Sequence, residues 1–190
     1  HRVAIVRDPR DEIISRLYYY ILPFISRFGY DREQVDQWLE VLREKERAPG
    51  EISVLEMVRR LRAITGRPVA EVPGGLEVYG EFLRRGADRL HVVRYEDFML
   101  GRVAALEEYL GVTLSAVRDV GDLGWTRRSA AADNWRRLFT AEDVAHYREA
   151  LAGPMARLGY TDWRLERPER LDPDAGSRYV EALVAKALED

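Results

Sequence analysis

The chain has 190 residues, of which 46% are hydrophobic and 33% charged, a balance typical of a globular domain with a core of its own. The net charge of −3 does not favour nucleic acid as a partner, so any anion site must be local. The absence of cysteine excludes disulfides, thiolate catalysis and cysteine-based zinc sites. No apolar run approaches the roughly 20 residues of a membrane span. No signal peptide is visible, so we expect a cytoplasmic protein. No cluster of metal-ligating residues is visible either, so we expect that the protein needs no metal.

The first predicted element is a buried strand over residues 3–6, a short run rich in β-branched side chains. Arg7 follows at the carboxyl end of this strand. Asp8 is a good N-cap and Pro9 suits the first helical position, so a helix begins there and carries Ser15. Ligands of open α/β sheets bind at the carboxyl ends of strands. A guanidinium and a hydroxyl placed there predict a clamp for a phosphate.

A series of helices is expected next. Helical spacing and helix breakers place them over residues 11–28, 31–47, 51–65 and 76–85. Pro23 should kink or end the first of these helices. The same helix carries three consecutive tyrosines at positions 18–20. These rings either line a pocket for an acceptor or belong to the core with one ring exposed.

A second buried strand is predicted over residues 89–94, and a right-handed crossover would make it parallel to the first. It runs into the sequence Tyr95-Glu96-Asp97. The ring of Tyr95 either stacks on a purine or packs in the core with its hydroxyl bonded. Glu96 and Asp97 are expected to fix the turn and to cap the helix over residues 101–110.

A loop over residues 121–134 carries the pair Arg127 and Arg128 among small residues. An arginine pair on such a loop suits a phosphate dianion, because backbone amides can approach the ligand closely. The alternative is a surface loop with solvated arginines. A helix over residues 141–158 follows, and a Pro-rich connector leads to a terminal helix over residues 177–188.

Three of these elements, in chain order, resemble those of PAPS-dependent sulfotransferases, where PAPS is 3′-phosphoadenosine 5′-phosphosulfate. They are Arg7-Asp8-Pro9-Arg10-Asp11 with Ser15, then Tyr95-Glu96-Asp97, then Arg127-Arg128 ahead of Trp135 and Phe139-Thr140. The resemblance covers roughly residues 2–160. It implies a site for PAPS and for PAP, the desulfated nucleotide that remains after transfer. The residues of this site would be Arg7, Ser15, Tyr95, Arg127, Arg128 and Ser129. The resemblance implies that Arg7, Ser15, Arg127 and Arg128 hold the 3′-phosphate and that Tyr95 lies near the adenine.

The chain departs from the family pattern at two places. The Lys and Gly of the family's arginine loop fall on Ser129 and Ala130, and Arg127 could restore the positive charge that is lost. The family's Gly-rich loop for the 5′-phosphosulfate and its histidine base are not found in the sequence. We expect both upstream of residue 1, so no catalytic residue is assigned. The connection from the Tyr-Glu-Asp turn to the arginine loop is also shorter than is usual in the family.

These observations predict a helix-rich α/β protein with a three-layer fold like that of P-loop NTPases, built on a central parallel sheet. The sulfotransferase-like domain would span residues 1–165, and a connector with a helix would span residues 166–190. The implied activity is transfer of a sulfuryl group from PAPS to a hydroxyl or amine of a small-molecule or carbohydrate acceptor. The alternatives are a P-loop-type kinase and a non-catalytic relative that binds PAP or another nucleotide. The acceptor and the oligomeric state are not predicted.

Overall fold

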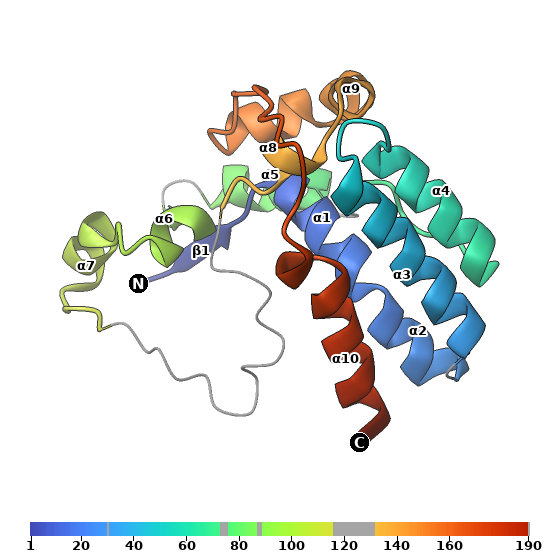
Figure 1. Ribbon diagram of the computed structural model, residues 1–190. Coiled ribbons are helices and arrows are strands. Elements are labelled where there is room, and N and C mark those ends of the chain that lie inside the picture. Colours follow the sequence, from blue (N-terminus) through green and yellow to red (C-terminus); the bar gives the residue numbers. More distant parts are fainter. Residues whose placement is uncertain (30, 73–75, 87–88, 116–131, 190) are drawn as a thin grey trace.

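The computed structural model describes residues 1–190 apart from residues 30, 73–75, 87–88, 116–131 and 190 (Figure 1). The described chain is a helix-rich α/β structure with a small parallel sheet. The strands are β1 (Val3–Val6) and β2 (His91–Arg94). The helices are α1 (Pro9–Tyr19), α2 (Ile21–Phe28), α3 (Arg32–Arg47), α4 (Val54–Thr65), α5 (Leu76–Arg85), α6 (Tyr95–Met99), α7 (Ala104–Leu110), α8 (Trp135–Leu138), α9 (Ala141–Arg157) and α10 (Ser177–Glu189).

The two strands pair in parallel, as the crossover predicted, with Val3 opposite His91 and Val6 opposite Arg94. Helices α1 to α4 and α10 run side by side on one side of the molecule, and β1, α6 and α7 lie on the other (Figure 1). Because β1 leads directly into α1, the carboxyl end of the sheet meets the helical layer. The predicted phosphate clamp therefore lies where the two parts join.

Helix α1 begins where the sequence predicted. The side chain of Asp8 accepts a hydrogen bond from the backbone N–H of Arg10, and Pro9 is the first helical residue. The helix ends at Tyr19, so the single helix expected over residues 11–28 is two helices. The break falls before Pro23, which lies in the first turn of α2, where a missing N–H leaves no helical hydrogen bond unmade.

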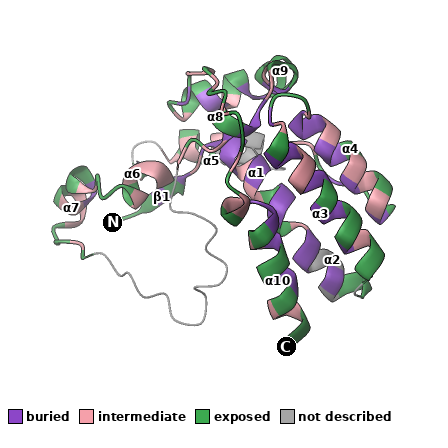
Figure 2. Cartoon of the chain, in the orientation of Figure 1, coloured by how far each residue is buried: buried purple, intermediate pink, exposed green. Residues whose placement is uncertain are grey.

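The main hydrophobic core lies within the helical layer, where Figure 2 shows most of the buried residues. Two buried charged side chains hold the start of α4 and the segment between α3 and α4 in place. The carboxylate of Asp143 accepts hydrogen bonds of 2.9 Å each from the backbone N–H groups of Val54 and Leu55. The ammonium of Lys45 donates to the carbonyls of Pro49 and Ile52, at 2.6 Å each. Burial lowers the pKa of Lys45 to about 8.

The sheet is much less covered than the helical layer. Val3, Ile5 and Val92 are 38%, 52% and 46% exposed. In the described chain, the main core takes no residue from β2, α6 or α7. Parallel sheets in proteins usually have both faces covered, so this one departs from the usual arrangement. Among the described residues, no helix is both long enough and apolar enough to cross a bilayer.

Candidate functional site

Arg7 and Ser15, the two residues of the predicted clamp, line one cavity with a volume of about 410 Å³. The cavity lies at the end of β1, between α1, α4 and the segment after α4. Its walls are formed by Arg7, Glu12, Ile13, Ser15, Arg16, Leu17, Tyr19, Tyr20, Val58, Val69, Ala70 and Glu71. Its size lies within the range of small-molecule sites in proteins, which is roughly 300–1,000 Å³.

Arg7 is half-buried, and no described carboxylate forms an ion pair with it. Its Nε is buried and has no hydrogen-bond partner in the described chain. The central carbon of its guanidinium lies 5.2 Å from the centre of the Tyr95 ring, so the arginine rests against this ring. A buried N–H without a partner costs about 1–3 kcal/mol.

The other charged side chains on the cavity wall are paired within the protein. Arg16 lies 2.8 Å from the Glu12 carboxylate. Glu71 lies 2.8 Å from Arg62, which approaches from α4. Because these pairs compensate one another, Arg7 is the cation of the described wall that has no direct ion-pair partner. An anion is therefore the ligand that the wall favours.

Arg10 has a role different from that of Arg7, although both belong to the same motif. Its Nη2 lies 2.6 Å from the Asp8 carboxylate, and both side chains are 2% exposed. Its guanidinium carbon lies 3.6 Å from the centre of the Trp135 ring and 4.7 Å from that of Trp163. It also donates a hydrogen bond to the carbonyl of Asp162. Arg10 is thus held by the protein and joins the β1–α1 turn to two distant segments.

Asp11 ties the residues before α8 to the first turn of α1. Its Oδ1 accepts a hydrogen bond of 3.0 Å from the backbone N–H of Trp135, and its Oδ2 accepts one of 2.8 Å from that of Asp133. Asp133 has a left-handed backbone with φ of 63°, a conformation that aspartate tolerates better than most residues. Burial raises the pKa of Asp11 to about 6, although both amides and the charge of Arg7 oppose this shift.

The raised pKa of Asp11 predicts a pH dependence of stability. The unfolded chain loses this proton near pH 3.8 and the folded chain near pH 6. The stabilisation is therefore fully present below pH 3.8 and is lost as the pH rises through 6. Relative to Asp11→Asn, the unfolding free energy of the wild type should fall by about 2 kcal/mol between pH 4 and 7. Urea titrations of both proteins across this range measure the difference, and a constant difference would contradict the assignment.

Tyr95 and Glu96 lie beside the turn between β1 and α1. Glu96 accepts hydrogen bonds from the backbone N–H of Asp8 at 3.0 Å and from the Tyr160 hydroxyl at 2.5 Å. Burial, together with this hydrogen bond, raises the pKa of Tyr160. Glu96 therefore ties α6 to the β1–α1 turn. The expected turn at Tyr95-Glu96-Asp97 is instead the start of helix α6, and neither acidic side chain caps α7, whose N-cap residue is Val103. Asp97 pairs with Arg94 at 3.1 Å on the exposed side. Tyr95 is half-buried, with Arg7 lying over its ring.

The three tyrosines at positions 18–20 divide between the two interpretations that the sequence left open. Tyr18 is 3% exposed and belongs to the core, whereas Tyr19 is 41% exposed and lines the cavity. Tyr20 also lines the cavity, with its hydroxyl 3.4 Å from the carbonyl of Pro68. Arg127, Arg128 and Ser129 lie outside the described residues, so their role stays a prediction.

Sequence reasoning missed the cavity wall formed by Val69, Ala70 and Glu71. Arg62 holds this segment, because its Nε donates to the carbonyl of Val69 at 3.0 Å and its Nη1 to Glu71. His146 lies 3.3 Å from the other oxygen of Glu71. The segment has no motif of its own and reaches the cavity only through tertiary packing. A Glu nine residues after an Arg gives no signal at helical spacing.

Comparison with known proteins yields no match to a protein-family model, to a curated protein or to a solved structure. In the described part of the chain, no group of three or more His, Asp or Glu residues is arranged to hold a metal ion. The cavity and the motifs at its edge are therefore the features of the protein that bear on its function.

Proposed function

We propose that the protein is a sulfotransferase that binds PAPS, with the 3′-phosphate of the nucleotide held by Arg7 and Ser15. The observation that carries this proposal is a half-buried arginine without a carboxylate partner, on the same cavity wall as the serine eight residues further on. A guanidinium offers forked donors that match a phosphate, and the hydroxyl adds another. Other anionic ligands would satisfy the same charge, so the extra ribose phosphate is what the experiment must test.

The residues of this chain would bind and orient the nucleotide. Tyr95 would lie near the adenine, and Arg127, Arg128 and Ser129 would complete the phosphate site. In the reaction, a general base removes the proton from an acceptor hydroxyl or amine, and that oxygen or nitrogen attacks sulfur in line. The bond between sulfur and the bridging oxygen breaks, and PAP leaves with the electron pair. No residue of this chain is assigned as the base.

Together with this function we propose a more specific fold, which is a three-layer arrangement like that of P-loop NTPases with a central parallel sheet. Two features of the structure support it. The strands are parallel with a helical crossover between them, and apolar side chains such as Ile5 and Val92 are exposed on the sheet. Further strands and helices beside this sheet would cover these side chains, as in other parallel sheets.

Thermal unfolding with PAP, AMP and ATP–Mg²⁺ tests the proposed function. PAP and AMP differ in the 3′-phosphate, which is the group assigned to Arg7 and Ser15. At 100 times its dissociation constant, PAP should stabilise the protein by about 2.7 kcal/mol and raise Tm by roughly 5–10 °C. AMP should raise it much less.

The remaining outcomes separate the alternatives. A larger shift with ATP–Mg²⁺ than with PAP would favour a kinase. Stabilisation by PAP without transfer of ³⁵S from labelled PAPS to a panel of phenols, sugars and amines would favour a non-catalytic relative. Equal shifts with PAP and AMP would contradict a site for the 3′-phosphate.

A further inference from the structure

The contact between Tyr95 and Arg7 follows from the register of the sheet. The last residues of the two parallel strands lie opposite each other, and Arg7 and Tyr95 come directly after them. The two side chains therefore leave the carboxyl end of the sheet as neighbours. Glu96 fixes this arrangement, because its carboxylate accepts a hydrogen bond of 3.0 Å from the backbone N–H of Asp8. The position of the ring beside the arginine is thus set by the backbone.

The ring of Tyr95 supports the charge of Arg7 without occupying its hydrogen-bond donors. The guanidinium carbon lies 5.2 Å from the centre of the ring, within the range of roughly 6 Å over which a ring face attracts a cation. A carboxylate in this place would accept hydrogen bonds from the guanidinium and cancel its charge. The carboxylates of Glu12 and Glu71 on the cavity wall are held by other arginines. Arg7 therefore keeps its charge and its donors for a ligand.

Tyr95 contacts Arg7 but does not line the anion cavity. The tyrosines on the cavity wall are Tyr19 and Tyr20. A small anion bound at Arg7 inside the cavity therefore need not touch Tyr95, and any effect of the ring on such an anion passes through the arginine. A free arginine side chain has many rotamers, and only the fraction in the binding-competent orientation contributes to affinity.

We propose that Tyr95 is a positioning residue, which holds the guanidinium of Arg7 in the orientation that binds anions. This inference rests on the proposed anion site and gives the tyrosine a second role besides the one near the adenine. Without the ring, Arg7 adopts further orientations, and the apparent affinity falls with the fraction that remains competent. The loss should be roughly 3- to 30-fold, the range expected for a cation–π contact.

Inorganic sulfate is the direct probe of this role, because it carries no adenine. In Tyr95→Leu, which removes the ring and keeps much of the apolar volume, the dissociation constant of sulfate should rise roughly 3- to 30-fold in calorimetric titrations. Tyr95→Phe keeps the ring, so its sulfate affinity should stay within about twofold of the wild type. An unchanged affinity in the leucine variant overturns the proposal. So do equal losses in both variants, or the absence of sulfate binding to the wild type.

Phe28→Leu is the matched control, because it removes another ring that contacts an arginine. The guanidinium carbon of Arg67 lies 4.2 Å from the centre of the Phe28 ring, and neither residue lines the cavity. The sulfate affinity of this variant should equal that of the wild type. A loss as large as that of Tyr95→Leu would show that the effect is not specific to Arg7 and would overturn the proposal.

A double-mutant cycle with PAP tests whether the effect of Tyr95 passes through Arg7. The PAP affinity is measured in the wild type, in Arg7→Ala, in Tyr95→Leu and in the double variant. If the ring positions the arginine, Tyr95→Leu weakens PAP binding more in the wild-type background than in Arg7→Ala. Equal losses in both backgrounds would mean that the ring acts on the nucleotide alone, and they would overturn the positioning role.

NMR on the wild type keeps the test valid if Tyr95→Leu does not fold. The ring current of Tyr95 moves the side-chain signals of Arg7 away from their usual positions, and these signals are identified by their loss in Arg7→Lys. A positioned arginine keeps this displacement when sulfate saturates the site. Loss of the displacement would show that Arg7 leaves the ring to bind, which overturns the proposal. Equal stabilisation by PAP and AMP would refute the proposed function and leave the role of Tyr95 intact.

Discussion

Arg7→Ala is expected to weaken PAP binding by about 1.5–3 kcal/mol, roughly 10- to 150-fold, the scale of a lost charge-assisted hydrogen bond. The structure adds a second expectation. Arg7 has no carboxylate partner among the described residues, and its Nε is buried without a hydrogen bond. Its removal should therefore leave the unfolding free energy within about 1 kcal/mol of the wild type. Calorimetry with PAP and urea unfolding without ligand measure the two effects separately.

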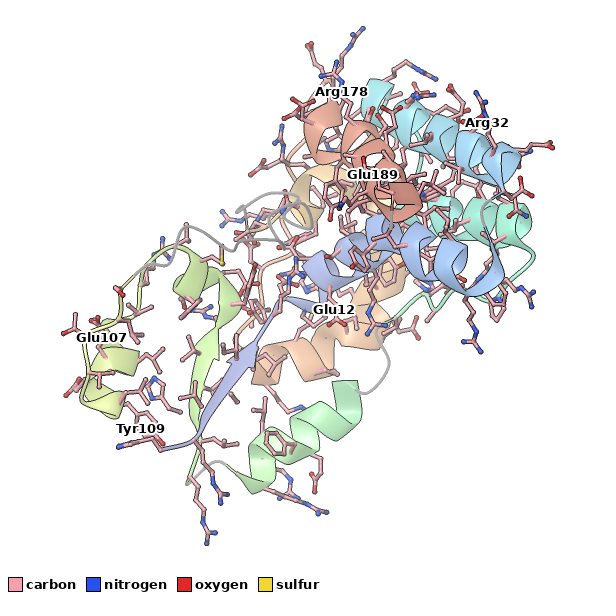
Figure 3. The ribbon with its side chains drawn as sticks, turned by 90° about the horizontal axis from the view of Figure 1, so that it is seen from below. Glu12, Arg32, Glu107, Tyr109, Arg178 and Glu189 are labelled. Carbon is pink, nitrogen blue, oxygen red and sulfur yellow. The ribbon has the colours of Figure 1, made fainter. Side chains whose placement is uncertain are left out.

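Two further variants sharpen this test. Arg7→Lys keeps the charge but not the fork, so its PAP affinity should fall between those of the wild type and the alanine variant. Arg32→Ala is the matched control. Arg32 lies on α3, across the helical layer from β1, and its side chain is 83% exposed (Figure 3). Unchanged PAP affinity in Arg7→Ala would remove the assigned role, and a large loss of stability would make Arg7 a structural residue.

Arg10→Ala is expected to have the opposite phenotype, with a loss of about 3–5 kcal/mol of unfolding free energy. The substitution leaves the Asp8 carboxylate buried without its ion pair. It also removes the side chain that packs against the rings of Trp135 and Trp163 and donates to the carbonyl of Asp162. The urea midpoint should fall accordingly, whereas any protein that remains folded should still bind PAP.

The double variant Asp8→Asn with Arg10→Met tests the physical reason for this loss. It removes both buried charges and keeps much of the volume beside the tryptophans. The single variant Arg10→Met keeps the same volume but leaves the Asp8 carboxylate unpaired. If the uncompensated carboxylate dominates, the double variant should be more stable than Arg10→Met, and equal stability of these two would mean that packing against the rings dominates. A loss below about 1 kcal/mol in Arg10→Ala would contradict the structural role.

Local chemistry was sufficient to predict how the chain enters α1 and how its strands pair. An aspartate followed by a proline caps and starts a helix whatever surrounds it, and the structure has this cap at Asp8. The short β-branched runs predicted both strands, and the long helical connection between them predicted parallel pairing. These features depend on neighbours in sequence or on chain connectivity. The break between α1 and α2 was misplaced, because Pro23 is tolerated in the first turn of a helix.

Only the tertiary structure decided which arginine of the motif can meet a ligand. In the sequence, Arg7 and Arg10 are two similar cations beside the same Asp-Pro step. In the structure, Trp135 and Trp163 approach from more than 120 residues away and enclose Arg10 with Asp8, so its charge is used within the fold. Arg7 instead faces a cavity whose far wall, at Glu71, is supplied by the segment after α4. Burial and charge compensation are properties of residues brought together from distant parts of the chain, so no local pattern could have shown them.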